Sequence, residues 1–141
     1  MVKRNFHIAL VEARYYGSVS EPLMNSAKRA LEEAGATHEH VWVLGALEVP
    51  AAVRLLHDSN RKFDGFVALG CVIRGETSHY DIVAEESARG LMDLSTREGI
   101  LIGNAILTVN TRAQAEKRAM TKGGDAVKAV LSLLKLRDDL K

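Results

Sequence analysis

The sequence is poor in cysteine and proline. Cys71 is its single cysteine, and only two prolines occur among 141 residues. A lone thiol cannot form a disulfide within the chain and is typical of a reducing compartment, so we expect a cytoplasmic protein. No proline-, glycine- or serine-rich stretch marks a linker. We therefore expect one domain over residues 1–141, a length that buries about two-thirds of the unfolded surface.

The sequence also lacks an excess of charge and a long apolar run. Nineteen basic residues against eighteen acidic ones leave a net charge of +1, and they are mixed along the chain. With no basic block, we expect no nucleic-acid partner. The first apolar run is interrupted by Glu12 and Arg14, and no run approaches the ~20 residues of a membrane span. We therefore expect neither a signal peptide nor a membrane segment.

Apolar runs of strand length alternate with segments of helical period. The runs predict strands at residues 6–11, 41–44, 66–69 and 100–107. Helices are expected from Ser20 as a cap, near 49–50, after 78, over 111–120 and over 123–137. The helix after residue 78 carries an apolar set, Ala84, Ala88, Leu91 and Met92. This alternation predicts an α/β fold, a three-layer αβα sandwich around a four-stranded parallel sheet, of flavodoxin-like architecture.

Ligands of such sheets bind beyond the carboxyl ends of the strands, which makes the segment GCVIRGETSHYD the most informative. Ser78 is followed three residues later by Asp81, a variant capping box, so the amides of 75–78 should lie at a helix N-terminus. A helix N-terminus attracts phosphate through its free N–H groups and its dipole. An ordinary capped helix behind a tight turn explains the same spacing.

Three other chemical interpretations of the sequence are weaker. Gly70 and Gly75 have the spacing of a nucleotide-binding P-loop, but an acidic residue, Glu76, stands where the lysine should be. Cys71 and His79 could form a nucleophile and base, although a lone cysteine after an apolar strand is more typical of packing. His38 and His40 form an H-x-H pair without a third ligand nearby, so we expect no metal site.

Several polar or aromatic residues at the ligand edge allow two interpretations each. An unperturbed histidine side chain has a pKa close to neutrality, so a histidine at position 79 suits a proton shuttle, or it simply begins a helix. Tyr15 follows the first strand and could stack on a heterocycle or shield the sheet end. Glu48 could accept hydrogen bonds from sugar hydroxyls or favour a helix dipole. Arg118 and Lys122 fit a solvated helix surface equally well.

Together these segments resemble the lumazine synthase family over nearly the whole chain. The strongest match is ALGCVIRGETSHYD followed by VAEESARGL, which is similar to the family signature LGxVIRGxTxHxD after the third strand. Further matches are VEARYY, GALEVPAA, GNAILTV, and QAEKRA ahead of KGGDA. The signature is long enough to be specific.

The resemblance implies an enzyme of the penultimate step of riboflavin biosynthesis. It would condense 5-amino-6-(D-ribitylamino)uracil with 3,4-dihydroxy-2-butanone 4-phosphate into 6,7-dimethyl-8-ribityllumazine, releasing phosphate and water without a cofactor or metal. The substrate amine would itself attack the ketone, so the chain needs no nucleophile of its own. The resemblance also implies a homo-oligomer, a pentamer or a multiple of it, with active sites between subunits, and leaves riboflavin synthase open as a protein partner.

Residue roles follow from the same resemblance. Those implied for the pyrimidine and ribityl chain are Tyr15 for stacking, Ala46, Leu47 and Glu48 for the ribityl group, and Val72 and Ile73 for the pocket wall. Those implied for chemistry and phosphate are His79 as acid and base, Gly75, Glu76 and Thr77 as the phosphate loop, and Arg118 from a neighbouring subunit.

The chain departs from the family pattern in two places. Asn104 stands where a phenylalanine is common, so an amide would contact the pyrimidine here. The segment from Arg118 to Lys122 is shorter than in many relatives, and Lys122 is carried over as a substrate-binding residue. A non-catalytic flavin or lumazine binder and a shell-forming protein are alternatives on the same fold. The presence of Glu48, His79 and Arg118 favours the enzyme.

Overall fold

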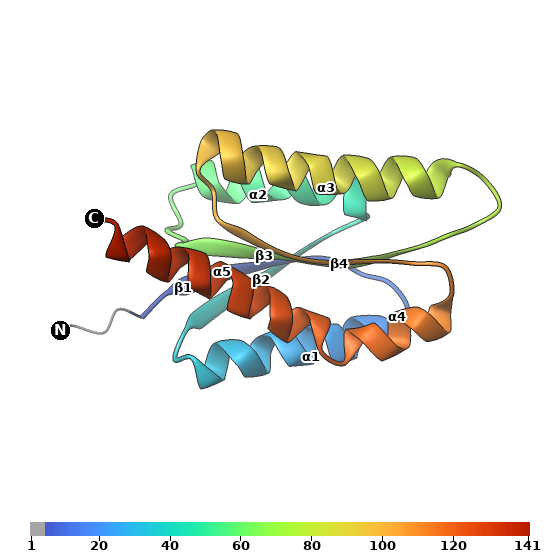
Figure 1. The fold of residues 1–141 in the computed structure, drawn as a ribbon, viewed down its shortest axis with the longest axis horizontal. Helices are drawn as coiled ribbons and strands as arrows, with labels where there is room; N and C mark the ends of the chain where they lie inside the picture. The colour runs from blue at the N-terminus through green and yellow to red at the C-terminus, as the bar shows by residue number, and fades with distance from the viewer. Residues whose placement is uncertain (1–4) are drawn as a thin grey trace.

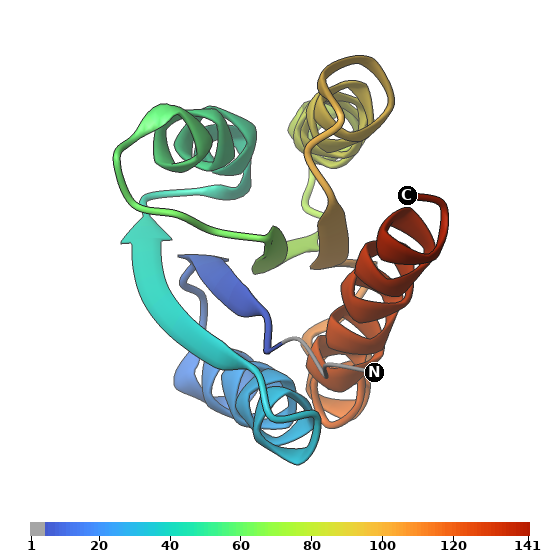
Figure 2. The same ribbon diagram turned by 90° about the vertical axis from the view of Figure 1, so that its left-hand side faces the viewer.

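The computed structural model describes residues 5–141 as a sheet between two layers of helices. The strands are β1 (His7–Ala13), β2 (Thr37–Val43), β3 (Gly65–Ile73) and β4 (Ile102–Val109), all parallel in the order β2-β1-β3-β4. The helices are α1 (Gly17–Glu33), η1 (Ala46–Glu48, a 3₁₀ turn), α2 (Val49–Asp58), α3 (His79–Glu98), α4 (Arg112–Ala119) and α5 (Lys122–Asp139). Helices α2 and α3 cover one face of the sheet and α1, α4 and α5 the other (Figures 1 and 2). The predicted αβα sandwich with a four-stranded parallel sheet is confirmed.

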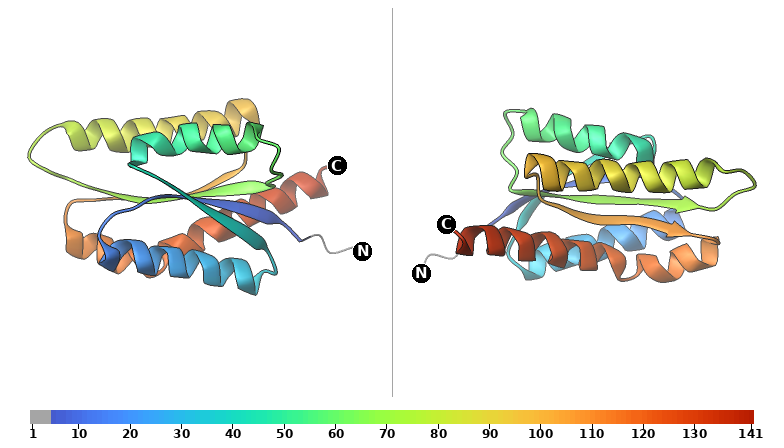
Figure 3. Two further views of the ribbon diagram at one scale, coloured as in Figure 1. Left: turned by 180° about the vertical axis from the view of Figure 1, so that it is seen from behind. Right: turned by 45° about the horizontal axis from the view of Figure 1, so that its top comes forward.

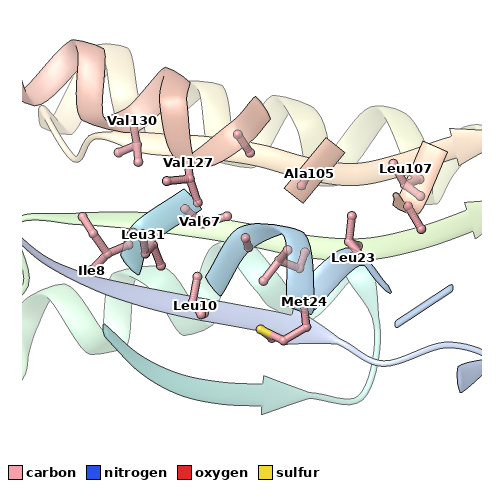
Figure 4. Close-up of a cluster of buried hydrophobic side chains, with 14 of the residues drawn as sticks. Ile8, Leu10, Leu23, Met24, Leu31, Val67, Ala105, Leu107, Val127 and Val130 are labelled. Atoms are coloured by element: carbon pink, nitrogen blue, oxygen red, sulfur yellow. The ribbon is translucent and has the colours of Figure 1, made fainter. Parts of the chain in front are cut away.

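Alternating side chains of the central strands supply a hydrophobic core to each face of the sheet. Ile8 and Leu10 of β1 point into the cluster under α1, α4 and α5, which Figure 4 shows together with Val127 of α5. Ala9 and Val11 belong to the cluster under α2 and α3. Period-two alternation places successive residues on opposite faces, and because both faces are covered the strand is apolar throughout.

Two glycines allow α5 to lie directly on its neighbours. A Cβ added to Gly103 of β4 would overlap the carbonyl oxygen of Ala126 in α5, and one added to Gly123 would overlap that of Leu23 in α1. In both cases the obstacle is backbone, which cannot rotate away as a side chain can. The close approach fixes where α5 begins and therefore where the α4–α5 junction lies.

We expect Gly103→Ala to lower the free energy of unfolding by about 3 kcal/mol, because the added methyl forces β4 and α5 apart. Urea unfolding followed by circular dichroism measures the change. Gly17→Ala is the matched control, since its methyl would meet only Glu21 Oε1 at 3.9 Å, and it should shift stability by less than about 1 kcal/mol. Equal effects of the two substitutions would contradict the packing described here.

Strand boundaries differ from the prediction where the site lies. β3 was expected to end at residue 69 but continues to Ile73, because residues 70–73 pair with 106–109 of β4. β4 itself spans 102–109 instead of 100–107. The nonlocal pairing extends β3 through a glycine and a cysteine that have no strong strand preference of their own. The segment that joins β3 to the next helix therefore starts at residue 74, four residues later than the local pattern indicates.

The prediction that Ser20 caps the first helix is wrong. α1 begins at Gly17, so Ser20 lies within it and Pro22 lies in its second turn rather than its first. The Ser20 hydroxyl instead accepts the Tyr15 N–H at 2.8 Å. Ser20 thus ties the residue after β1 to the helix that follows.

α3 rests on the sheet through a narrow stripe. Of the apolar set expected on this helix only Leu91 is buried, together with Ser87, whereas Ala88 is exposed and Met92 is 62% exposed.

No helix within residues 5–141 has the length and apolar character needed to cross a membrane.

Candidate functional site

The carboxyl ends of the strands meet at one edge of the sheet, from which α3 and α4 begin (Figure 3, right-hand view). A cavity of about 250 Å³ lies there between the ends of β1 and β3, the segment joining β2 to η1, and the first turn of α3. We call it the His79 cavity. Five residues expected in the site line it: Tyr15, Ala46, Val72, Ile73 and His79.

Each of these residues takes its place from the element that ends or begins beside it. Tyr15 follows β1, Ala46 opens η1, and His79 is the first residue of α3. Val72 and Ile73 are the last two residues of β3. Because the strands are parallel, their ends bring together segments that are far apart in the sequence.

Leu47 and Glu48 follow the lining residue Ala46 but do not themselves line the His79 cavity. Both are exposed residues of η1. The Glu48 carboxylate folds back toward the cavity, since a Cβ built on Gly45 would lie 3.1 Å from Glu48 Oε1 and Gly45 is a lining residue. The carboxylate is therefore placed to accept hydrogen bonds from a polyol in the cavity.

The loop of residues 75–78, which we call the phosphate loop, joins β3 to α3. All four residues are exposed, and His79 follows them directly. His79 N–H donates to Thr77 Oγ1 at 3.3 Å. The loop thus ends at the positive end of a 20-residue helix, as expected for an anion site.

The predicted capping box at this helix does not form. Ser78 is the N-cap residue, but it has helical torsion angles (φ −72°, ψ −1°) and its side chain makes no capping hydrogen bond. An N-cap hydroxyl usually reaches the helix amides from an extended backbone, which Ser78 does not have. Asp81 lies instead near Arg74, with Arg74 Nη1 to Asp81 Oδ1 at 3.4 Å.

Tyr15 lines the cavity with an uncharged phenol whose ring is in contact with Tyr16. Burial raises the pKa of its hydroxyl, and the neighbouring Tyr16 raises it further. The two rings are in edge contact with centroids 4.6 Å apart. The Arg112 guanidinium covers the Tyr16 ring at 4.0 Å from its centroid. This support leaves the Tyr15 ring available for a flat heterocycle.

Cys71 also lines the His79 cavity, but its thiol does not suit a nucleophile. It is a buried residue of β3, and burial raises the pKa of the thiol from 9.0 to about 11. A thiol must ionise to attack, so the Cys71 and His79 pair is disfavoured as a nucleophile and base.

We expect iodoacetamide to alkylate Cys71 at pH 8 about a hundredfold more slowly in the native protein than in urea, because the higher pKa leaves that much less thiolate. Mass spectrometry of timed samples measures both rates. Similar rates in the two states would mean that the thiol is neither buried nor held neutral.

Arg14 lines the His79 cavity, although it was not among the predicted site residues. Its side chain lies between the His79 cavity and the sheet edge, with Nε 3.8 Å from the buried Glu12 carboxylate and the guanidinium 5.1 Å from the Trp42 ring centroid. His40 Nε2 approaches the same carboxylate at 3.1 Å. Val83 is a second lining residue that was missed, although its position four residues after His79 on one helix face could have indicated it.

Asn104, Arg118 and Lys122 lie outside the His79 cavity. Asn104 is exposed on β4 and lines a second hollow of about 430 Å³, which we call the Asn104 groove. Val83 and His79 of α3 face the cavity, whereas Tyr80 and Ala84 face the groove, so the helix separates the two.

The two cationic residues lie on the other layer of helices. Arg118, in the last turn of α4, is exposed and donates only to the Gln114 carbonyl at 3.3 Å. Lys122 opens α5, with its ammonium 3.8 Å from Asp125 Oδ2. The helices that carry them, α4 and α5, are joined by a two-residue junction, 120–121. Within residues 5–141, no cluster of His, Cys, Asp or Glu could hold a metal ion.

This arrangement defines a class of protein: an α/β sandwich with a small-molecule site at the carboxyl edge of its parallel sheet. The sequence model of the 6,7-dimethyl-8-ribityllumazine synthase family matches residues 5–138. The chain belongs to this family.

Individual relatives agree with the family match. The 6,7-dimethyl-8-ribityllumazine synthase of Methylorubrum extorquens (strain PA1) is 53% identical over 138 residues, 92% of this chain and 80% of that protein. 6,7-dimethyl-8-ribityllumazine synthase 1 of Rhizobium meliloti (strain 1021) is 49% identical over 142 residues, 95% of this chain and 93% of that protein. The 6,7-dimethyl-8-ribityllumazine synthase of Agrobacterium fabrum (strain C58 / ATCC 33970) is 49% identical over 142 residues, 95% of this chain and 96% of that protein.

Proposed function

We propose that the chain makes 6,7-dimethyl-8-ribityllumazine from 5-amino-6-(D-ribitylamino)uracil and 3,4-dihydroxy-2-butanone 4-phosphate, the penultimate step of riboflavin biosynthesis. The observation that carries the proposal is the His79 cavity: in a member of this family, one hollow brings an aromatic ring together with an imidazole at a helix N-terminus. The family match covers residues 5–138 and supports a single domain.

In the proposed complex the pyrimidine stacks on Tyr15 against the wall formed by Val72 and Ile73. The ribityl chain runs along η1, where Ala46 and Leu47 offer backbone groups and Glu48 accepts from hydroxyls. The apolar wall and the neutral phenol favour a flat uncharged ring over an anion. These contacts place the substrate amine above the phosphate loop.

The second substrate is held by its phosphate. Backbone N–H groups of Gly75, Glu76 and Thr77, together with the α3 dipole, bind the anion. The Glu76 side chain is exposed. Glu76 contributes its backbone N–H to the anion site rather than its carboxylate. Fixing both substrates removes much of the entropic cost of bringing them together.

The substrate amine then attacks the ketone carbon, and water leaves as the imine forms. His79 takes the amine proton and returns one to the departing hydroxyl, and it acts again when phosphate is eliminated. His79 begins α3 at the edge of the cavity, so its ring lies where both substrates would meet. No protein nucleophile is needed, which fits the neutral Cys71 thiol.

We further propose that a second copy of the chain completes each site, in a pentamer or a multiple of it. The proposal is supported by the positions of Asn104 and Arg118, which one chain keeps apart from its own His79 cavity. Exposed apolar side chains flank both hollows, among them Leu44 at 97% and Ile82 at 53%. Such exposure is typical of interaction surfaces. We propose a cytoplasmic location from the single thiol.

Mixing the purified protein with both substrates and following lumazine absorbance tests the proposed activity. We expect formation well above the spontaneous rate, with release of one phosphate per lumazine. A non-catalytic binder or a shell-forming protein would leave the rate at its background value and so contradict the proposal.

A further inference from the structure

Arg74 joins the two ends of the phosphate loop. It directly follows β3, and its backbone N–H donates to the Val109 carbonyl of β4 at 2.9 Å. Its Nε donates to Asn110 Oδ1 at 3.1 Å, and its Nη1 reaches Asp81 Oδ1 at 3.4 Å. The guanidinium carbon lies 4.3 Å from the centroid of the Tyr80 ring. One planar group thus contacts the end of β4 and the first turn of α3.

The phosphate loop has little other support. Its four residues are exposed, and a Cβ added to Gly75 would meet nothing within 4 Å. Packing therefore does not fix the loop. The distance and angle between the end of β3 and the start of α3 set the direction of the loop amides, and Arg74 bridges these two points.

The Arg74 side chain lies on the far side of α3 from the His79 cavity of its own chain. It lines the Asn104 groove and is absent from the His79 cavity. The side chain is 49% exposed, so its ion pair with Asp81 adds little to stability. Three side chains contact the Arg74 guanidinium, although these contacts add little to the stability of the fold. Such an arginine is better suited to fixing the orientation of the phosphate loop than to stabilising the folded chain.

We propose that Arg74 is a positioning residue for phosphate recognition, acting through the phosphate loop and α3 without touching substrate. This inference rests on the proposed function and deepens it. Arg74 holds the loop amides and His79 in the orientation that the sugar phosphate requires, while the pyrimidine subsite, built on β1, β3 and η1, does not depend on it.

Steady-state kinetics of Arg74→Ala and Arg74→Lys tests the proposal. We expect Arg74→Ala to raise the KM for the sugar phosphate about tenfold, since displaced amides bind the anion poorly, and to leave the KM for the ribitylamino-pyrimidine within twofold. Arg74→Lys should show most of the same rise in KM, because an ammonium cannot bond Asn110 and Asp81 while stacking on Tyr80. Asn110→Ala, which removes one contact, should give a smaller change in the same direction.

Arg97→Ala is the matched control. Like Arg74, Arg97 is an exposed arginine that pairs with an aspartate of α3, Asp93 at 3.6 Å, but it lies at the far end of the helix. It should change neither KM. An equal rise in KM for both substrates, or a fall in the unfolding midpoint of Arg74→Ala with unchanged KM values, would overturn the positioning role of Arg74.

Direct phosphate binding separates this inference from the proposed activity. Isothermal titration with inorganic phosphate should give a Kd about tenfold weaker for Arg74→Ala than for the unsubstituted protein. Lumazine formation at background rate would contradict the proposed activity alone, because the titration does not require turnover. Identical phosphate affinities, or no phosphate binding by the unsubstituted protein, would overturn the inference about Arg74.

Discussion

Replacing His79 by alanine is expected to lower kcat by a factor of roughly 10² to 10⁴ while leaving residual turnover, the range typical of a lost general acid and base. His79 begins α3 and lines the cavity where the substrates would meet. In the proposed mechanism it transfers protons in imine formation and phosphate elimination, and the two substrates would remain bound and oriented without it. The reaction therefore continues slowly.

Steady-state lumazine absorbance with both substrates at saturation measures this effect. His79 is exposed, so its removal should not alter the unfolding midpoint. His79→Asn is the informative companion, because it keeps a polar side chain but cannot exchange protons near neutral pH, and it should be as slow as the alanine variant. Unchanged kcat in either variant would remove His79 from the mechanism.

Replacing Arg118 by alanine is expected to lower kcat/KM for the sugar phosphate by roughly 10² to 10⁴. A guanidinium binds a phosphate through two charge-assisted hydrogen bonds, each worth about 1.5–3 kcal/mol. The loss should fall mainly on the KM of the sugar phosphate, and the pyrimidine should be little affected. Because the single hydrogen bond of the Arg118 side chain within residues 5–141 is the 3.3 Å bond to the Gln114 carbonyl, the fold should not change.

Lys117→Ala is the matched control for Arg118. Lys117 is the adjacent exposed cation of the last turn of α4, so its loss removes the same charge from the same helix end. If general electrostatic attraction were the cause, both variants would lose affinity alike. Equal effects would contradict a specific phosphate contact by Arg118.

The order of elements could be predicted from the sequence because it depends on local patterns. The apolar run at 66–69 lies at the centre of β3, and the change from period two to period 3.6 marks each helix. The carboxyl-edge rule then placed Tyr15, Ala46 and His79 together, since each follows or precedes a strand end. These parts need no knowledge of long-range contacts.

The remaining parts depend on contacts between distant segments. β3 extends to Ile73 only because β4 pairs with it, and Ser20 serves Tyr15 only because α1 starts before it. The capping box does not form because Ser78 has helical torsion angles, and Asp81 lies instead near Arg74. Local propensity cannot predict these outcomes, because the stabilising partner lies elsewhere in the chain.

The separation of the candidate site into two surfaces also required the structure. The resemblance assigned Arg118 to a neighbouring subunit, but it did not place Asn104 across α3 from His79. The apolar residues of α3 divide in the same way. Leu91 is buried against the sheet, whereas Met92 is exposed. The helix therefore has one stripe for the sheet and a second apolar surface open to a partner.

Co-assembly of two inactive variants tests most directly whether each site combines two chains. Tagged His79→Ala and Arg118→Ala chains, expressed together in equal amounts, should assemble at random, so about one quarter of interfaces would pair an intact His79 cavity with an intact Arg118. We predict recovery of about a quarter of the unsubstituted activity in the doubly tagged assemblies. Activity no greater than the average of the two separate variants would show that each chain works with its own Arg118, and would contradict the shared site.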